Sequence, residues 1–533
     1  MGRVVFAALL FSAATCWPAH AALVISAQPT ANVTCVSNVC SATSGNAVLN
    51  ATTLQSMLAS SSVTVSSGSS AEDISVGMAL SWVSANTLTL DSYRSIAIRK
   101  PVAITGNGGL VLRTNDSGTN GSLSFSGNGH VTFWSTSDAL TINGVAYRLV
   151  SDLGTLSGDI DGDPSGNYAL ADSYDAKVNG TFTLPPISIA FAGTFEGLGN
   201  TISKLRIRDT LSANVGLFAQ ITSTGTARDL HIDAAVIGTY NPGPTDAAYI
   251  GAFVGLNKGT IAGVTVSGTV TGAKNECVGG LTGYNSDGTI SSSSSSAAVH
   301  GTNDSAVGGL VGLNPGGTIA DSFASGAVSG TGAAVVGGLV GGNYGSAIIQ
   351  RSHSTGSVTG GGGPRSWSGG LAGGNSATIE LSYATGSVAN GTQVGGLVGM
   401  NFDGDGDGIV NSYATGAVSS ALTKGESGGL VGSNEGIVGT SYSTGAVTAT
   451  GAQPRVGGSV GFEKAASSSI ASSYWDTTTS GTSAGVGLGS AKGLTGLATS
   501  QLQSGLPAGF STTIWVESGS INGGLPYLLA NVP

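Results

Sequence analysis

Three carboxylates in one acidic run are the most concentrated set of side chains that could do chemistry. Asp403, Asp405 and Asp407 are each followed by glycine. Ca²⁺ prefers carboxylate and carbonyl oxygens, and this alternation has the spacing of the first half of a calcium-binding loop. The twelfth position of that pattern is Ala414, where a complete EF-hand loop needs Glu. We therefore expect a loose surface calcium site, or a solvated acidic loop as the alternative.

The other titratable residues form no recognisable catalytic set. A second acidic cluster, Asp159, Asp161 and Asp163, repeats the spacing more weakly, and the histidines are dispersed without an H-E-x-x-H motif: His20, His130, His231, His300 and His353. Carbohydrate-active β-helical enzymes need clustered carboxylates on one face. The acidic residues of the repeats share no common offset: Asp287, Asp304, Asp321, Glu380, Glu426 and Glu435. We predict no catalytic residues and no enzymatic activity, and no cofactor other than calcium.

Aromatic side chains recur in a column at nearly constant spacing. The steps are 30, 30, 30, 29 and 32 residues, and the members are Phe323, His353, Tyr383, Tyr413, Tyr442 and Tyr474. Strand alternation sets this column opposite Ala414 and Val418, so the rings line an outer surface if the small residues face inward. Rings about 4.8 Å apart would form a platform for glycans or a protein, with Phe323, Tyr383, Tyr413 and Tyr442 as binding residues. Packing of the rings in the core or between coils is the alternative that we favour.

Composition limits the classes of protein to which these residues can belong. The 533 residues include 88 Gly, only 9% are charged, and hydrophobic residues reach 40%. There is no three-residue glycine period, which excludes collagen, and the apolar content argues against disorder. The net charge is -10, and the 19 Lys and Arg are scattered, so we expect no binding to nucleic acid.

The first 21 residues are typical of an export signal. Arg3 precedes an apolar run from Val4 to Ala14, and the segment ends in Ala19-His20-Ala21, a small-x-small cleavage pattern. The run is too short to span a bilayer, and no later stretch qualifies, so no membrane span is expected. An oxidising exterior would favour a disulfide between Cys35 and Cys40, with Cys277 left as a small buried residue.

Repeats with a longer period follow a region of short strands. Apolar-x-apolar triplets from about Asp73 to Ile142 predict short strands joined by turns. From Ile250 an anchor, apolar-Gly-Gly-Leu-Val-Gly-x-Asn, recurs at steps of 28, 29, 29, 32, 26, 33 and 29 residues, which average 29.4. A second anchor of the type Ser-Tyr-Ala-Thr-Gly follows the first, so each repeat holds about three short strands.

Such repeats can bury an apolar face only by stacking, which favours a parallel β-solenoid. We predict an all-β, right-handed parallel β-solenoid (β-helix) of Gly-rich repeats of about 29 residues, with terminal caps. One Asn keeps a constant offset in each repeat, at Asn257, Asn285, Asn314, Asn343, Asn375, Asn401 and Asn434. Stacking would align these amides in a hydrogen-bonded ladder. A left-handed turn position is the alternative for the same Asn residues.

The two anchors together resemble the GLUG motif of filamentous-haemagglutinin-like exoproteins and other bacterial surface proteins. Upstream, Asp73 to Arg94, Leu140 to Tyr147 and Gly193 to Ile202 are similar to haemagglutinin-type repeats. The resemblance covers roughly residues 65 to 529. It implies a secreted or surface-exposed β-helical protein of the adhesin type, and a Gram-negative source.

These observations predict the organisation and role of the chain. The segments are a signal peptide (1–21), an N-terminal cap (22–64), a haemagglutinin-like region (65–205), a GLUG-repeat solenoid (206–475) and a C-terminal cap (476–533) that closes the last coil. We expect a non-catalytic, adhesin-like protein that binds glycans or proteins of a host or neighbouring cell through a repetitive face. A β-helical polysaccharide lyase or hydrolase, or a purely structural surface scaffold, is the alternative.

Overall fold

Parallel strands dominate the computed structural model, which describes residues 21–240, 247–404, 406–464 and 468–533. The chain is all-β, as predicted, and its strands build a parallel β-solenoid with a spacing of about 29 residues. It divides into two compact units, residues 1–146 and 147–533. This division falls inside the segment 65–205 that the sequence grouped together, because the strands before residue 146 stack on one another and those after it stack on the GLUG coils. Most of the predicted signal peptide, residues 1–20, lies outside the described residues.

The smaller unit is a short stack of parallel strands. Its columns are β1 (Ala22–Ser26), β6 (Asp73–Val76), β9 (Ile96–Ile98) and β12 (Leu123–Phe125); β7 (Leu80–Trp82), β10 (Val102–Ile104) and β13 (Val131–Phe133); and β5 (Val63–Ser66), β8 (Thr87–Asp91), β11 (Gly109–Arg113) and β14 (Ala139–Ile142). Inward positions such as Ile74, Ile96 and Leu88 are fully buried. Alternation of period two therefore positions this core, as the triplets predicted.

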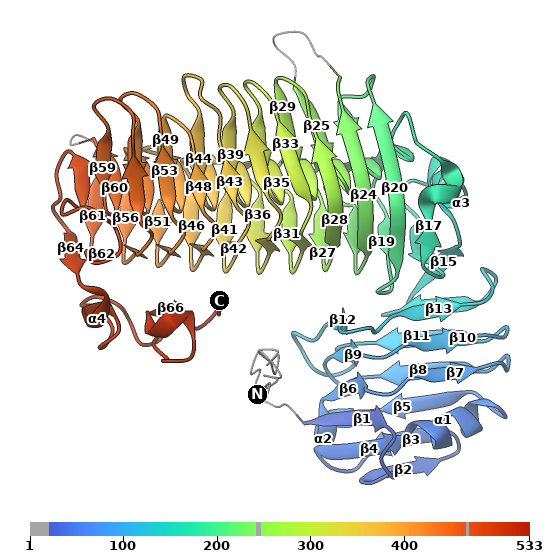
Figure 1. Ribbon diagram of the computed structural model, residues 1–533. Helices are drawn as coiled ribbons and strands as arrows, with labels where there is room; N and C mark the ends of the chain where they lie inside the picture. Colours follow the sequence, from blue (N-terminus) through green and yellow to red (C-terminus); the bar gives the residue numbers. More distant parts are fainter. Residues whose placement is uncertain (1–20, 241–246, 405, 465–467) are drawn as a thin grey trace, which may run out of the picture. The chain divides into compact units, whose positions relative to one another are not determined.

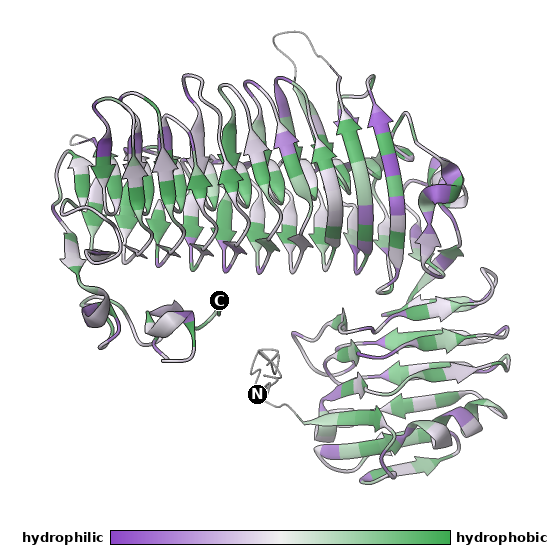
Figure 2. Cartoon of the chain, in the orientation of Figure 1, coloured by the Kyte–Doolittle hydropathy of each residue, from purple (hydrophilic) through white to green (hydrophobic). Residues whose placement is uncertain are grey.

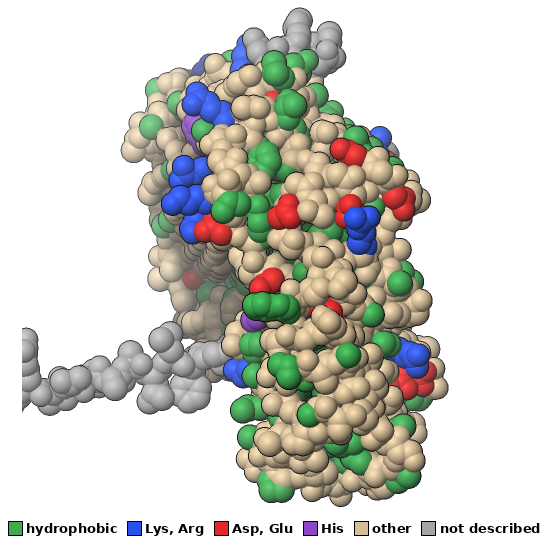
Figure 3. All heavy atoms as spheres, turned by 90° about the vertical axis from the view of Figure 1, so that its right-hand side faces the viewer, with side chains coloured by type: hydrophobic (Ala, Val, Ile, Leu, Met, Phe, Trp, Pro, Cys, Tyr) green, Lys and Arg blue, Asp and Glu red, His purple; other side chains and the backbone are tan. Residues whose placement is uncertain are grey.

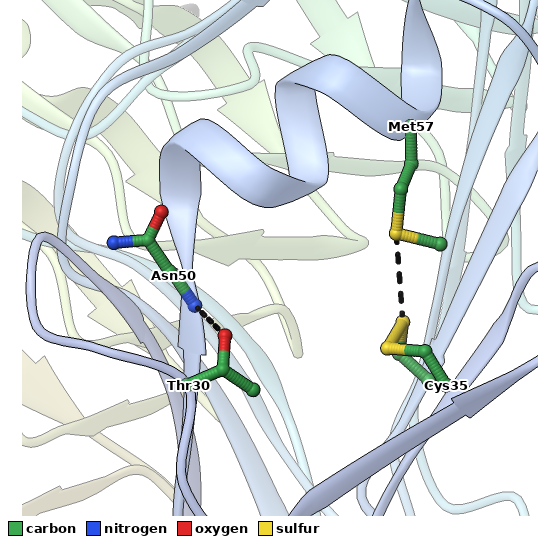
Figure 4. The surroundings of a disulfide bond; sticks show 5 residues. Thr30, Cys35, Asn50 and Met57 are labelled. Carbon is green, nitrogen blue, oxygen red and sulfur yellow. Dashed lines mark hydrogen bonds between the residues drawn. A yellow bond between two sulfur atoms is a disulfide. The ribbon is translucent and has the colours of Figure 1, made fainter.

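A hairpin and a helix occupy the predicted N-terminal segment 22–64. β2 (Val33–Val36) and β3 (Val39–Ala42) pair antiparallel, and Cys35 and Cys40 form a disulfide across them. The Cys40 sulfur lies 4.0 Å from the Met57 sulfur at the end of α1 (Ala51–Leu58), as Figure 4 shows. Asn50 caps α1 by accepting a hydrogen bond from the Thr53 amide. The helix buries Leu54 and Leu58.

The larger unit repeats one coil many times (Figure 1). A representative coil contains β34 (Ala306–Gly308), β35 (Val311–Pro315), β36 (Thr318–Ala320), β37 (Phe323–Ala324) and β38 (Val328–Gly330). Each strand pairs in parallel with its equivalents in the coils before and after. Figure 2 shows hydrophobic residues concentrated along these strands, where the side chains of Leu310, Val307 and Ile319 form part of one continuous core.

The constant glycines of the first anchor allow two sheets of the coil to approach closely. A Cβ atom on Gly312 would lie 2.5 Å from the backbone nitrogen of Val278, and one on Gly341 would lie 2.6 Å from the backbone nitrogen of Val307. Side chains larger than hydrogen therefore cannot occupy these positions without moving the backbone. This contact explains why glycine recurs at the same offset in the anchor.

The seven predicted asparagines form a continuous ladder inside the solenoid. Each Nδ2 donates to the Oδ1 of the next Asn at 2.7 to 2.9 Å, and the Nδ2 of Asn434 donates to Glu463. All seven are fully buried, and none of them has a positive φ, so the left-handed turn alternative is wrong. The ladder satisfies amides that have no access to water.

A second ladder of serines fixes the turn before the second anchor. The Ser322 amide donates to the Ser352 hydroxyl at 3.2 Å, and the Ser322 hydroxyl donates to the Ala320 carbonyl at 2.7 Å. The same pattern continues along the stack at Ser352, Ser382, Ser412 and Ser441. In the coils of this serine ladder the preceding residue is left-handed although it is not glycine: Ser292, Asp321, Arg351, Leu381, Asn411, Thr440 and Ser472. The serine hydrogen bonds therefore hold a turn that the backbone alone disfavours.

Removal of one rung tests the asparagine ladder. Asn314→Ala deprives Asn285 of an acceptor and Asn343 of a donor, so two buried polar atoms lose their partners. We expect a loss of about 2–5 kcal/mol in the free energy of unfolding, measured by chemical denaturation. Asn303→Ala removes an exposed amide from the neighbouring loop and should cost less than about 0.5 kcal/mol. Equal losses in the two variants would contradict the structural role of the ladder.

Candidate functional site

The aromatic column predicted from the second anchor is present as a stack of parallel rings. The ring centroids from Phe323 through His353, Tyr383 and Tyr413 to Tyr442 are 5.1, 4.6, 4.9 and 5.0 Å apart. Successive planes differ by 2 to 10°. In-register pairing of the short strands that carry these residues sets this spacing.

The tyrosines are buried and stacked between coils, as the favoured alternative predicted, and the accessible platform is wrong for them. Tyr383 is 2% exposed, and Tyr413 and Tyr442 are 0% exposed. Their rings pack in a separate apolar cluster with Trp515, Phe510, Leu502 and Leu528 from the C-terminal segment. Phe323, at 40% exposed, is the one predicted binding residue that the segment leaves open.

The C-terminal segment also corrects the predicted cap at 476–533. Residues 486–497 extend the stack through β63 (Val486–Leu488) and β64 (Leu494–Leu497). Residues 498–533, here called the strap, instead run back along the outside of the solenoid (Figure 1). Their periodicity differs from that of the coils, so they cannot stack as another repeat.

Hydrogen bonds fix the strap to at least three coils. The Tyr442 hydroxyl donates to the Pro526 carbonyl at 2.6 Å, and the Tyr474 hydroxyl donates to the Ala508 carbonyl at 2.6 Å. Further along, the Asn531 amide donates to the carbonyls of Ser352 and Leu381 at 3.1 and 3.0 Å. The tyrosine column therefore holds the strap rather than presenting an open surface.

Two neighbouring tyrosine hydroxyls differ in their partners. The Tyr442 hydroxyl has both an acceptor and a donor, since the Asn522 amide also donates to it at 2.8 Å. The buried Tyr413 hydroxyl has no hydrogen-bond partner. Burial raises the pKa of both hydroxyls, so each remains protonated.

Removal of these hydroxyls tests how the strap is held. Tyr442→Phe should lower the free energy of unfolding by about 1–2 kcal/mol, because it removes two hydrogen bonds, although the Asn522 amide still donates to the Pro526 carbonyl at 2.9 Å. Tyr413→Phe should be neutral or stabilising, because it removes an unpaired polar group. Limited proteolysis of the strap and thermal unfolding would measure both effects. A larger loss in the Tyr413 variant would contradict this assignment.

The acidic runs lie apart from the aromatic column. Asp403 and Asp407 are exposed, and Asp405 lies outside the described residues, so calcium binding there stays a prediction. Asp159 and Asp161 lie on α3 (Leu153–Gly162), where Asp159 pairs with Arg148 at 2.6 Å. Within the described residues, no group of three or more His, Cys, Asp or Glu side chains could hold a metal ion.

The most buried charged pair lies near the start of the larger unit and was not predicted from the sequence. Arg228 Nε lies 2.7 Å from Glu196 Oε2, and Arg228 Nη2 lies 3.3 Å from the Tyr147 hydroxyl. Burial raises the pKa of Glu196, although the Arg228 guanidinium opposes this shift. The Glu196 side chain has no exposed surface, so it cannot reach a substrate. The pair therefore contributes to packing between coils.

An open cavity of about 590 Å³ lies between α3 and the loop before β18 (Ile187–Phe191). Its lining includes Leu153, Phe182, Leu184 and a single carboxylate, Asp161. The general acid and base of a glycosidase need two carboxylates that face each other. The cavity does not provide that pair.

No helix in the described parts of the chain is both long and apolar enough to cross a bilayer.

Glu276 is a buried acid close to the free, buried Cys277. Its Oε2 accepts a hydrogen bond from the Ala273 amide, and its Oε1 has no hydrogen-bond partner. Burial raises the pKa of Glu276 to about 8 and that of the Cys277 thiol to about 12. The thiol is therefore protonated at neutral pH and is not a nucleophile.

The raised pKa of Glu276 predicts a dependence of stability on pH. Between about pH 4.5 and about pH 8 the folded protein holds a proton that the unfolded chain has lost, so the free energy of unfolding falls as pH rises through this window. Glu276→Gln should reduce that fall. Denaturant unfolding at about pH 5 and about pH 9 measures it, and an unchanged slope in the variant would contradict the assignment.

Six aromatic side chains at three register positions of the two closely packed sheets remain partly exposed. We call them the aromatic strip: Tyr249, Tyr284, Tyr344, Trp367, Phe402 and Phe462. Tyr249 is the second residue of β25 (Ala248–Gly251), and Trp367 begins β44 (Trp367–Gly369). The others lie in or just after strands that end near the asparagine ladder. The strip follows the edge along which the two closely packed sheets meet.

Contacts between rings place these side chains in groups. The Tyr249 and Tyr284 centroids are 4.4 Å apart, and Trp367 and Phe402 meet edge to face at 5.0 Å. The Tyr344 ring lies over glycine, since a Cβ on Gly342 would lie 2.4 Å from its ring. Further along, the Arg455 guanidinium lies 4.7 Å above the Phe462 ring. The strip therefore offers several ring faces and edges on one side of the solenoid.

Sequence reasoning missed the strip because its residues occupy variable positions. Trp367 stands two residues before the Gly-Gly pair of the anchor, and Tyr249 holds the equivalent place before Gly251. The others stand beside the constant Asn or, for Phe462, beside Glu463 at the same register position. A signal was present: aromatic residues are only 6% of the chain, yet they recur at these few offsets. Their positions vary from coil to coil, so they form no constant column in the sequence.

Comparisons with known proteins agree with the repeat architecture. Residues 274–299 match the family model of the GLUG motif. Over 127 residues, 22% of this chain, the sequence is 34% identical to halomucin from Haloquadratum walsbyi. That match covers about 1% of the length of halomucin. The chain is thus a repeat protein that carries the GLUG motif on a parallel β-solenoid.

Proposed function

We propose that this chain is a secreted or surface-exposed, non-catalytic repeat protein that acts as an adhesin. It binds glycans or proteins of a host or neighbouring cell through the aromatic strip. The observation that carries the proposal is the strip itself: partly exposed Tyr, Trp and Phe rings that recur along one outer edge of a rigid stack. Ring faces pack well against the apolar faces of sugars and against apolar protein side chains.

The architecture supports a role in binding over one in catalysis. The inward positions of each coil are occupied by Leu, Val, Asn and Ser that hold the stack together, so variation is confined to outward positions. When one ring binds an extended partner, the next ring meets that partner at a high effective concentration. Several weak contacts along the stack therefore give a higher overall affinity. A solenoid that carries similar rings on successive coils suits an extended partner such as a polysaccharide.

Export and calcium binding belong to the same proposal. The apolar run after Arg3 and the Ala19-His20-Ala21 pattern support cleavage of a signal peptide and an extracellular location, and a Gram-negative source follows from the haemagglutinin resemblance. The disulfide between Cys35 and Cys40 suits an oxidising compartment. Calcium held by Asp403, Asp405 and Asp407 would stabilise an exposed loop of the same surface protein.

A glycan and matrix array tests this function with matched aromatic variants. A variant with Tyr284→Ala, Trp367→Ala and Phe402→Ala removes three rings of the strip. We expect it to lose most of the binding shown by the wild-type chain, about tenfold or more in affinity, since each ring contributes stacking energy. Phe323→Ala is the control, because it removes an exposed ring from the other column.

The outcomes separate the candidate surfaces. Loss of binding only in the strip variant supports the proposal, provided that its melting temperature stays close to that of the wild type. Loss in the Phe323 variant alone would move the site to the open end of the tyrosine column. Absence of binding by the wild-type chain would contradict an adhesive function and favour a structural scaffold.

A further inference from the structure

Two unpaired arginines stand on the first long strand of the larger unit. β20 (Thr201–Asp209) buries Leu205 and Ile207 and exposes the residues between them. Arg206 and Arg208 are exposed, and in the described part of the chain their guanidinium groups have no acidic or hydrogen-bonding partner. The nearby Lys204 differs, because it pairs with Asp175 at 2.6 Å.

A hydroxyl-bearing segment flanks one side of the arginine pair. Phe182 forms a parallel bridge with Ile207, with hydrogen bonds of 2.9 and 2.8 Å to the backbones of Arg206 and Arg208. Thr181 and Thr183 flank Phe182 in this segment, and both also line the open cavity beside α3. Both threonines are exposed.

On the other side of the pair, the residues directly opposite the arginines are uncharged, and the nearest outward carboxylate of the neighbouring strand is Asp233, two residues before Ala235. In β24 (His231–Gly238), Ala235 lies opposite Arg206 and Ile237 lies opposite Arg208. The next strand, β28 (Thr265–Thr271), places Thr269 beside Ala235. No carboxylate therefore occupies the outward positions directly beside the two guanidinium groups, although the whole chain has a net charge of -10. In the view of Figure 3, Lys and Arg side chains gather along one edge of the upper part, with an acidic side chain next to them.

We propose that Thr181, Thr183, Arg206 and Arg208, here called the arginine patch, bind an acidic polysaccharide. Two outward side chains on one strand are about 6.6 Å apart, so each guanidinium can hold a separate anionic group of an extended polymer. Guanidinium groups bind carboxylates and sulfates in a two-pronged geometry. The exposed threonine hydroxyls of the adjoining segment match the free hydroxyl groups of a sugar chain.

Other polyanions fit this surface less well. Binding to anionic lipid through a basic cluster takes roughly four to eight Lys or Arg residues, and the patch has two. Nucleic-acid binding needs a broad basic footprint, which an acidic chain with scattered cations lacks. A sheet face with two charges and adjacent hydroxyls suits a polymer with widely spaced anionic groups.

The arginine patch and the aromatic strip have no residue in common. Binding at the patch would be electrostatic. The affinity would fall as the salt concentration rises, because screening increases and the release of counterions becomes less favourable. Binding at the strip would be much less sensitive to salt, because ring stacking does not depend on charge. The two surfaces can therefore be tested independently of each other.

The test measures binding of the full chain to immobilised polymers by biolayer interferometry. The probes are polygalacturonate, which presents carboxylates, dextran sulfate, which presents sulfates, and neutral dextran. We expect the chain to bind at least one acidic polymer and to bind dextran far more weakly. Arg206→Gln with Arg208→Gln should weaken that binding by about tenfold or more, and the loss should shrink between about 50 and about 300 mM NaCl.

A matched control removes the same charge elsewhere. Arg365→Gln with Lys424→Gln replaces two exposed cations on other coils of the larger unit and should leave the affinity unchanged. Binding of polygalacturonate alone or dextran sulfate alone supports the proposal and identifies the anionic group. Equal losses in the two double variants, no binding to either acidic polymer, or preferred binding to single-stranded DNA or phosphatidylserine vesicles would overturn it. Melting temperatures verify that all variants are folded.

Discussion

In-register stacking of equivalent residues is the constraint on which the larger unit depends. A coil alone cannot bury its apolar face or pair its backbone hydrogen-bonding groups. The neighbouring coils supply the hydrogen-bond partners and cover the apolar face. Whatever occupies an inward position must then be compatible with a copy of itself one coil away. Leucine meets this requirement by packing, glycine by leaving room for a neighbouring backbone, and asparagine by being both donor and acceptor. An aspartate or a lysine in the same column would meet its own charge.

The fold could be predicted from the sequence because this constraint makes the same residue types recur at a constant spacing. Residues such as Leu310 and Asn314 recur at constant offsets, and their spacing alone indicates stacked coils and an amide ladder. The tyrosine column obeys the same rule, and its stacked geometry followed from the same reasoning. The burial of the column could not be predicted in this way. Tyr413 is covered by Trp515, a residue about a hundred positions away that belongs to no repeat. The spacing of the repeats does not reveal which residues a non-repeating segment covers.

The candidate binding surfaces were hidden for the opposite reason. Trp367 and Arg206 stand at positions where stacking imposes no rule, because an outward side chain need not match its neighbour. Such positions vary from coil to coil, and a search for constant columns discards them. The division of the chain after residue 146 was missed in a similar way, since short apolar triplets occur on both sides of it and only the choice of stacking partner distinguishes them.

The strap changes how the solenoid would respond to a pulling force. A simple stack can peel open one coil at a time from its end, since each coil touches only its neighbours. The strap contacts Tyr474 near the last coils and Ser352 several coils away, and it packs on the rings between them. Load applied at the C-terminal end therefore reaches several coils in parallel, and these must yield together. A surface protein anchored or tethered through this end would gain mechanical resistance where tension enters the molecule.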